Sequence, residues 1–344
     1  MINLKKIGLT ALAGSLVAFS ANAVELSVSG GSEITYTTDG GSTDLTGNPF
    51  GAATSMKFSG SGDVGFGTAT IVRTLRDNQS AASYSSAYTT LDMGDLGVLS
   101  FDSTGGALVG TAAQDDILPT AYEEVWNGVG AAGNGTSGIA SQNTLGYRHT
   151  IMGVSLSLGY RKGGTDVVTS GDGGNSGAGS TGSTVDWNLA YDVPGVDGLS
   201  VSGGMSETDT NSYSVTAQPN TDNNSATAHI LYETGPVSVG LRVAEENSGV
   251  LAAVGTTAEA YSIAFNVNDN LTLSIAEQEL TYDAIATTTT GTAALDTKQT
   301  TQAINAAYTM GAATIRTTIS QADDVGGVAG IDDEHMEVSL VLAF

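Results

Sequence analysis

The last nine residues of the chain, 336–344, read MEVSLVLAF. One side of a period-2 pattern in this stretch holds Met336, Val338, Leu340, Leu342 and Phe344. Because successive side chains of a β-strand point to opposite faces, the segment presents one continuous apolar face that ends in an aromatic ring. This pattern is typical of the closing strand of a membrane β-barrel, and an edge strand of a soluble β-sandwich is the alternative.

The first 23 residues have the pattern of a cleavable export signal. Lys5 and Lys6 precede a mostly apolar stretch, 7–19, and Ala21-Asn22-Ala23 has the small-x-small form that signal peptidase accepts. The apolar stretch is too short for a membrane-spanning helix, which needs about 20 apolar residues. The sequence therefore predicts a signal peptide over 1–23 and an exported single domain over 24–344.

The composition excludes several classes of protein. The 344 residues carry a formal charge of −25, which becomes two units more negative without Lys5 and Lys6. Nucleic acid is excluded as a partner because phosphate binding needs basic patches. The absence of cysteine excludes disulfides and thiolate metal sites. With 46 glycines and few helix formers, the chain favours strands and turns.

Alternating segments joined by short turns predict sixteen strands. They span 24–38, 54–61, 66–75, 88–93, 98–103, 143–150, 154–161, 184–193, 199–207, 226–234, 237–244, 260–267, 271–280, 301–310, 313–321 and 334–344. Short Gly, Asp and Pro turns alternate with longer polar connections, and all five prolines lie outside the strands. An even strand number and full backbone pairing predict an all-β, 16-stranded antiparallel transmembrane β-barrel. A barrel of this size has a lumen wide enough for water.

Five fragments carry a family resemblance. They are the opening Val24–Gly30, the turn Met93–Gly97, the strand segments Leu145–Arg148 and Leu158–Arg161, and the terminal Phe344. In this order they resemble the Gram-negative general diffusion porins, especially the alphaproteobacterial type, over the whole mature sequence. The resemblance implies passive diffusion of ions and small hydrophilic solutes through the cell outer membrane. It also implies that the third long loop, here 105–142, folds into the barrel as a constriction loop.

The same resemblance implies a set of partners. Porins of this type form homotrimers whose contacts use the early strands and the last strand. They meet outer-membrane lipid and lipopolysaccharide, and the barrel-assembly machinery inserts them. We therefore expect the same partners for this chain.

The segment 105–142 contains the densest acidic cluster of the chain. Four carboxylates are expected to project into the narrowest water: Asp115, Asp116, Glu123 and Glu124. A small apolar group is expected to anchor the loop to the wall at about 25 cal/mol per Å² buried: Ile117, Leu118, Tyr122, Val125 and Trp126. A solvated acidic surface loop without a role in permeation is the alternative.

Basic strand residues are the expected counterpart of this loop, because the resembled family places such residues opposite it. The candidates are Lys57, Arg73, Arg148, Arg161, Arg242 and Arg316. Arg148, Arg242 and Arg316 have clear inward parity, whereas the parity of Arg73 is ambiguous. A lipid-facing arginine near the midplane costs about 2–4 kcal/mol, which favours the lumen. A wall salt bridge without effect on selectivity is the alternative for any one of them.

The net negative charge of the chain predicts a modestly cation-selective pore, and the wall arginines oppose this preference. No cofactor is expected. Acidic connections leave a Ca²⁺ or Mg²⁺ site open and unassigned, since their spacing matches no defined calcium loop. These acids are Asp172, Asp222, Asp323, Asp324, Asp332 and Asp333.

An enzymatic function is not expected. The three histidines, His149, His229 and His335, lie in no local motif of a nucleophilic triad. The alternatives to a porin are an exported acidic adhesin or calcium-dependent binding protein and, more remotely, an outer-membrane hydrolase.

Overall fold

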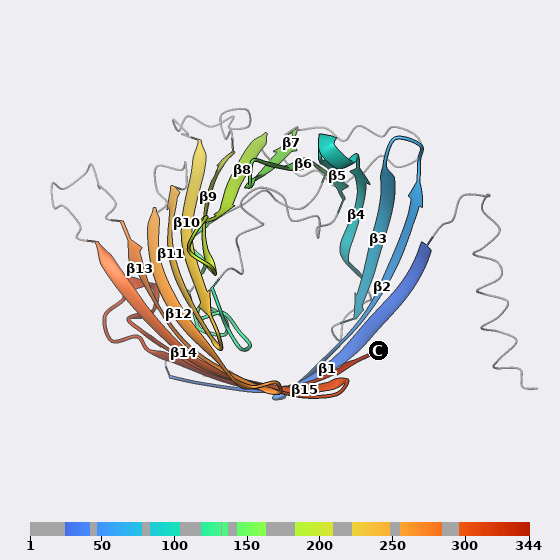
Figure 1. Ribbon diagram of the computed structural model, residues 1–344. Helices are drawn as coiled ribbons and strands as arrows, with labels where there is room; N and C mark the ends of the chain where they lie inside the picture. Colours follow the sequence, from blue (N-terminus) through green and yellow to red (C-terminus); the bar gives the residue numbers. More distant parts are fainter. Residues whose placement is uncertain are drawn as a thin grey trace, which may run out of the picture.

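The computed structural model is a closed antiparallel barrel of sixteen strands, which confirms the predicted fold class (Figure 1). It describes residues 25–41, 47–77, 83–103, 118–131, 133–136, 143–162, 183–208, 222–247, 255–283 and 296–344. The predicted signal peptide lies outside these residues. Within them, no helix is long and apolar enough to cross a membrane.

Each strand pairs with its neighbours in sequence, and the first also pairs with the last. The strands are β1 (Glu25–Gly41), β2 (Phe50–Asp63), β3 (Thr68–Asp77), β4 (Ser83–Asp92), β5 (Val98–Asp102), β6 (Thr144–Ile151), β7 (Val154–Arg161), β8 (Thr184–Asp192), β9 (Leu199–Thr208), β10 (Asn223–Thr234), β11 (Val237–Asn247), β12 (Thr256–Asn268), β13 (Leu271–Tyr282), β14 (Thr297–Met310), β15 (Ala313–Asp323) and β16 (Asp333–Ala343). Two short 3₁₀ turns, η1 (Gly94–Leu96) and η3 (Val325–Gly327), complete the described elements.

Several strands are longer than predicted. β4 begins at Ser83 and β10 at Asn223, before the apolar alternation starts. The added residues are mostly polar on both faces, so a period-2 pattern of apolar residues does not mark them. Backbone pairing with the neighbouring strand extends these ends instead.

The barrel closes between β1 and β16. Their antiparallel register runs from Gly31 opposite Ala343 to Gly41 opposite Asp333. Beyond it, the backbone N–H and C=O of Phe344 each form a 2.9 Å hydrogen bond with Gly30. A Cβ atom on Gly30 would lie 2.6 Å from a carbonyl oxygen and 3.1 Å from the Phe344 ring, so glycine permits this close approach.

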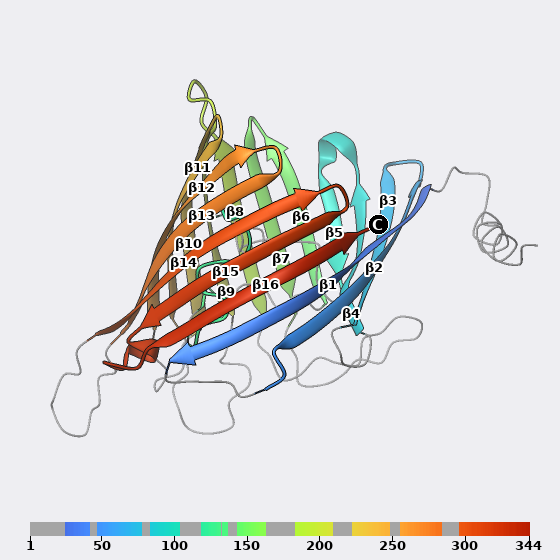
Figure 2. The same ribbon diagram turned by 90° about the horizontal axis from the view of Figure 1, so that it is seen from below.

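Short turns and longer connections lie at opposite ends of the barrel. Figure 2 shows the short turns along the upper rim, near the C-terminus. The turn between β6 and β7 is formed by Met152 and Gly153, both with positive φ. The connections at the other rim include the long segment between β5 and β6.

The outer face of the barrel is apolar and the inner face is polar. Across β12 to β16, successive paired positions hold Ile263, Ile275, Ile304, Ile319 and Met336. The four isoleucines are exposed on the outside. Val338, Leu340 and Leu342 of β16 are also exposed there, as is Phe344 directly after the strand, whereas Ser339 on the opposite face of β16 is buried. The alternation of the closing strand therefore separates the two faces.

Candidate functional site

Residues 118–131 and 133–136 lie inside the barrel, and we call them the inner loop (Figure 1). They are the described part of the segment 105–142. The amide nitrogen of Gln278 on β13 donates to the carbonyl of Gly133 at 3.0 Å, and that of Gln299 on β14 donates to Gly130 at 3.1 Å. The inner loop is thus held against the wall formed by the later strands.

Buried polar side chains of the wall hold the beginning of the inner loop. The Ser274 hydroxyl accepts from the backbone N–H of Ala121 at 2.9 Å. The Asn305 side chain accepts from the N–H of Glu123 at 3.2 Å and donates to its carbonyl at 3.1 Å. Both wall residues are buried. Because these partners satisfy the loop backbone, this stretch can lie on the wall without losing hydrogen bonds.

Apolar contacts support the same region. Leu118 and Val125 are buried, whereas Trp126 is half-buried. A Cβ atom on Gly240 of β11 would lie 2.5 Å from Pro119 and 3.0 Å from Leu118, so glycine makes room for the loop there. The predicted anchor Ile117 lies outside the described residues. The anchoring is therefore mixed, with more polar contacts than the sequence pattern indicated.

Arg242 holds the end of the inner loop, which corrects its expected role in the pore wall. Its guanidinium lies 5.2 Å from the centroid of the Trp126 ring. It donates to the carbonyl of Asn134, and to the Thr136 hydroxyl at 3.1 Å. Only 2% of Arg242 is exposed because the loop covers it. Its inward parity was predicted correctly, but the pore water does not reach its charge.

Tyr122 is the centre of a polar cluster in the lumen. Its hydroxyl donates to Glu337 of β16 and lies 3.3 Å from Glu33 Oε1 of β1. The guanidinium of Arg316 on β15 lies 4.2 Å from the Tyr122 ring centroid and forms a 2.5 Å ion pair with Glu33. The Ser339 hydroxyl also donates to Glu33. Burial, together with the hydrogen bond to Glu337, raises the pKa of Tyr122 above its ordinary value.

The predicted acidic residues of the loop have different environments. Glu123 is half-buried and accepts a 2.5 Å hydrogen bond from the Asn127 amide. Glu124 is only 8% exposed, which corrects the expectation that its carboxylate projects into the pore water. Asp115 and Asp116 lie outside the described residues.

A polar hollow of about 290 Å³ lies beside Tyr122. Its charged lining residues are Glu33, Glu123, Glu337 and Arg76. Sequence reasoning missed three of them. Glu33 and Glu337 have the inward parity of their strands, a signal that was present in the sequence. Arg76 was missed because the predicted strand ended at Leu75, one residue too early.

Two of the remaining wall arginines face inward. Arg148 on β6 shares its face with the buried residues Thr144 and Gly146, and it is itself exposed. Among the described residues it forms no ion pair. Arg161 at the end of β7 donates to the Thr184 hydroxyl at 3.2 Å. Lys57 on β2 also has inward parity.

Arg73 lies on the outer face, which corrects its assignment to the pore wall. It shares that face of β3 with Ile71 and Leu75, which are both exposed on the outside, and it pairs with the outward Phe58. Its guanidinium donates to the backbone carbonyls of Val72 at 2.7 Å and Tyr88 at 3.2 Å.

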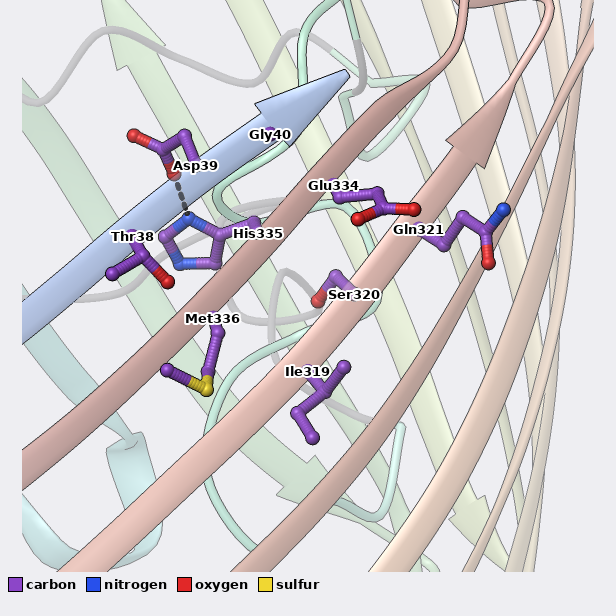
Figure 3. Close-up of a pocket in the computed structure, with 9 residues that line it drawn as sticks. All are labelled: Thr38, Asp39, Gly40, Ile319, Ser320, Gln321, Glu334, His335 and Met336. Atoms are coloured by element: carbon purple, nitrogen blue, oxygen red, sulfur yellow. Dashed lines mark hydrogen bonds and ion pairs between the residues drawn. The ribbon is translucent and has the colours of Figure 1, made fainter. Parts of the chain in front are cut away.

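The tip of the inner loop reaches the wall near the rim of longer connections. A second hollow of about 410 Å³ lies there among β1, β15 and β16 (Figure 3). In it, His335 Nδ1 and Asp39 Oδ1 point toward each other at 2.6 Å. A Cβ atom on Gly128 would lie 2.2 Å from the His335 ring, and the N–H of Gly130 donates to Asp333 at 2.7 Å. The loop tip therefore packs directly on β16.

The acidic connections do not assemble a metal site in the part of the chain that the structure describes. No group of three or more His, Cys, Asp or Glu side chains there has the arrangement to hold a metal ion. Asp172 lies outside the described residues.

The fold matches solved porin structures. No protein-family model and no curated protein sequence matches this chain. Salmonella typhi OmpF in complex with daunomycin superposes with a TM-score of 0.64 at 14% identity, over 94% of this chain and 98% of that one. OmpT of Vibrio cholerae superposes with a TM-score of 0.63 at 12% identity, over 95% of this chain and 99% of that one. A variant of the Rh. blastica porin superposes with a TM-score of 0.62 at 11% identity, over 93% of this chain and 100% of that one. The likeness establishes that this chain has the 16-stranded porin fold.

Proposed function

We propose that the chain is an outer-membrane porin that forms a water-filled channel for passive diffusion of ions and small hydrophilic solutes. The observation that carries this proposal is the division of the barrel into an apolar outer face and a polar inner face. The inner loop supports it, because it is tethered to one wall of the lumen and is bordered by a hollow with charged walls.

The barrel architecture fits a membrane location. In hydrocarbon every backbone polar group must be paired within the protein, and a closed antiparallel barrel meets this requirement. The exposed isoleucine row across β12 to β15 offers a surface for lipid chains. A signal peptide over 1–23 would bring the chain to the export pathway. Outer-membrane lipid, lipopolysaccharide and the barrel-assembly machinery are the partners that follow.

We further propose a homotrimer whose contacts include the face of β1 to β4. Arg73 supports this face, because an arginine that meets lipid near the midplane costs about 2–4 kcal/mol. Coverage by a neighbouring subunit would remove that cost. Ser32 and Thr54, whose hydroxyl oxygens lie 3.4 Å apart on the same outer face, add polar surface there.

A modest cation preference is part of the proposal. Glu33, Glu123 and Glu337 line the hollow together with a single arginine, Arg76. Arg316 offsets the charge of Glu33 through their ion pair. The remaining negative charge attracts cations into the narrowed lumen.

The test is single-channel conductance and reversal potential of the purified mature protein in a planar bilayer under a KCl gradient. Conductance steps in groups of three with a cation-favouring reversal potential are the expected result. Glu123→Gln and Glu337→Gln should each shift the potential toward zero. Glu334→Gln, on the outer face of β16, serves as the matched control. A folded, heat-modifiable protein without conductance would refute the pore and favour a surface-binding role.

A further inference from the structure

We infer that the hollow beside Tyr122 is a binding subsite for solutes with two cationic groups and one carboxylate, the class of the free basic amino acids. The inference rests on the proposed function, since such solutes reach the hollow through an open lumen. It adds a preferred class of solute to a channel that otherwise admits small hydrophilic molecules by size and charge.

Five separate parts of the chain build the hollow: the strands β1, β2, β3 and β16 and the inner loop. Glu33 and Glu337 come from the paired strands β1 and β16, and Arg76 comes from β3. The inner loop supplies Tyr122 and Glu123. The contacts of the Tyr122 hydroxyl with Glu337 and Glu33 set the position of the loop against the two strands. Tyr122, Glu33 and Glu337 are therefore held in one arrangement before a solute arrives, which lowers the cost of binding.

The charges in the hollow do not cancel one another. Glu33 is paired with Arg316 at 2.5 Å. Glu337 accepts from the hydroxyls of Tyr122 and Thr37, and Glu123 accepts from the Asn127 amide. Within the described residues, neither of these two carboxylates forms an ion pair, and Arg76 forms none either.

Two carboxylates and one guanidinium thus remain to meet a solute. Arg76 offers the planar donors that suit a carboxylate, while Glu123 and Glu337 suit two ammonium groups. A neutral zwitterion satisfies only one of the two carboxylates. An acidic amino acid carries too few cations and adds a repelled charge. A basic amino acid leaves no group in the hollow without a partner.

The size of the hollow fits a molecule of this class. Its volume is about 290 Å³. A free amino acid occupies such a space together with some retained water. Because the hollow is open to the lumen, we expect weak, rapidly reversible binding, as transport requires.

The experiment compares two amino acids as blockers of the KCl current through single channels. Free lysine carries an α-ammonium and a side-chain ammonium group. Norleucine has the same carbon chain but lacks the side-chain ammonium group. We expect an apparent Kd for lysine about fivefold lower than for norleucine, the size of effect typical of a partly exposed charge pair. Glu337→Gln should abolish most of this preference for lysine. Arg76→Gln should weaken the binding of both lysine and norleucine.

The controls separate this inference from the proposed function. The amide in Glu337→Gln still accepts from Tyr122, and a retained heat-dependent mobility shift verifies the fold. Glu334→Gln lies three positions earlier on β16 but faces outward, so lysine should bind it as it binds the parent chain. Equal block by lysine and norleucine, or a lysine preference that survives in Glu337→Gln, would overturn the subsite while the pore stands. Absence of any KCl current would overturn the pore itself.

Discussion

The hydroxyl of Tyr122 donates a hydrogen bond to a carboxylate oxygen of Glu337, and this contact joins the inner loop to a strand residue 215 positions later. Glu33 on the neighbouring strand lies within 3.3 Å of the same hydroxyl. One side chain of the loop is thus in contact with both strands that close the barrel. The position of the loop in the lumen depends on the closure of the wall.

Replacement of Tyr122 by phenylalanine should loosen the inner loop without unfolding the barrel. A hydrogen bond of this kind contributes about 1 kcal/mol, and the ring retains its contact with Arg316. We expect larger open-channel current noise and closure at lower voltage, measured in planar bilayers. Tyr308→Phe, on the outer face of β14, is the control. Identical noise in the two variants would show that the hydroxyl does not hold the loop.

The contribution of Tyr122 to the stability of the folded state should persist to alkaline pH. Burial and the bond to Glu337 raise its pKa above the ordinary value of 10.0. The folded state therefore favours the protonated phenol, so its stabilisation is complete below pH 10.0 and is lost as pH rises through the raised pKa. The difference in thermal unfolding midpoint between the parent chain and Tyr122→Phe should stay constant from neutral pH to about pH 10.0 and shrink as the pH rises further. A difference that vanishes already at mildly alkaline pH would contradict the assignment.

Substitution of Gly240 by leucine should displace the beginning of the inner loop. A Cβ atom there would lie 2.5 Å from Pro119, and overpacking of this kind costs about 1–3 kcal/mol. The barrel itself stays closed because the backbone pairing of β11 is unaffected. We expect a lower single-channel conductance, because the added side chain pushes the loop away from the wall and into the lumen. Gly47→Leu is the matched control, since a Cβ atom added at Gly47 would have no neighbouring atom within 4 Å. An unchanged conductance in Gly240→Leu would argue against the packing role.

Arg76 should influence ion selectivity and Arg73 should not, although they lie on the same strand. Arg76 lines the hollow in the lumen, whereas Arg73 shares the outer face with Ile71. Arg76→Gln should shift the reversal potential further toward cations, and Arg73→Gln should leave it unchanged. The measurement is the reversal potential under a KCl gradient. A shift in Arg73→Gln comparable to that in Arg76→Gln would place Arg73 in the pore.

The sequence predicted the strands well because alternation is a local property. The closing strand shows this, since the outward set from Val338 to Phe344 follows directly from period-2 spacing. Prediction failed at strand ends, where β3 continues to Asp77 and brings Arg76 into the lumen. Polar residues at such ends carry no apolar alternation, and pairing with the adjacent strand decides how far they extend.

The inward or outward parity of a strand residue was not sufficient to predict its role in the candidate site. Arg242 and Arg316 both face inward, as predicted, but the loop covers Arg242 and leaves Arg316 beside the hollow, paired with Glu33. Glu124 is buried although the adjacent Glu123 is half-exposed. These differences depend on where the inner loop lies against the wall, and spacing within the chain does not contain that information.

The amino-acid sequence by itself determined the strand number, the closed antiparallel barrel and the division between apolar and polar faces. Each of these follows from side-chain alternation and turn residues within short segments. Only the tertiary structure decided which lumen residues meet water and which hold the inner loop. Those roles depend on contacts between residues far apart in the chain, such as Tyr122 with Glu33 and Glu337, and such contacts form only when the barrel has closed around the loop.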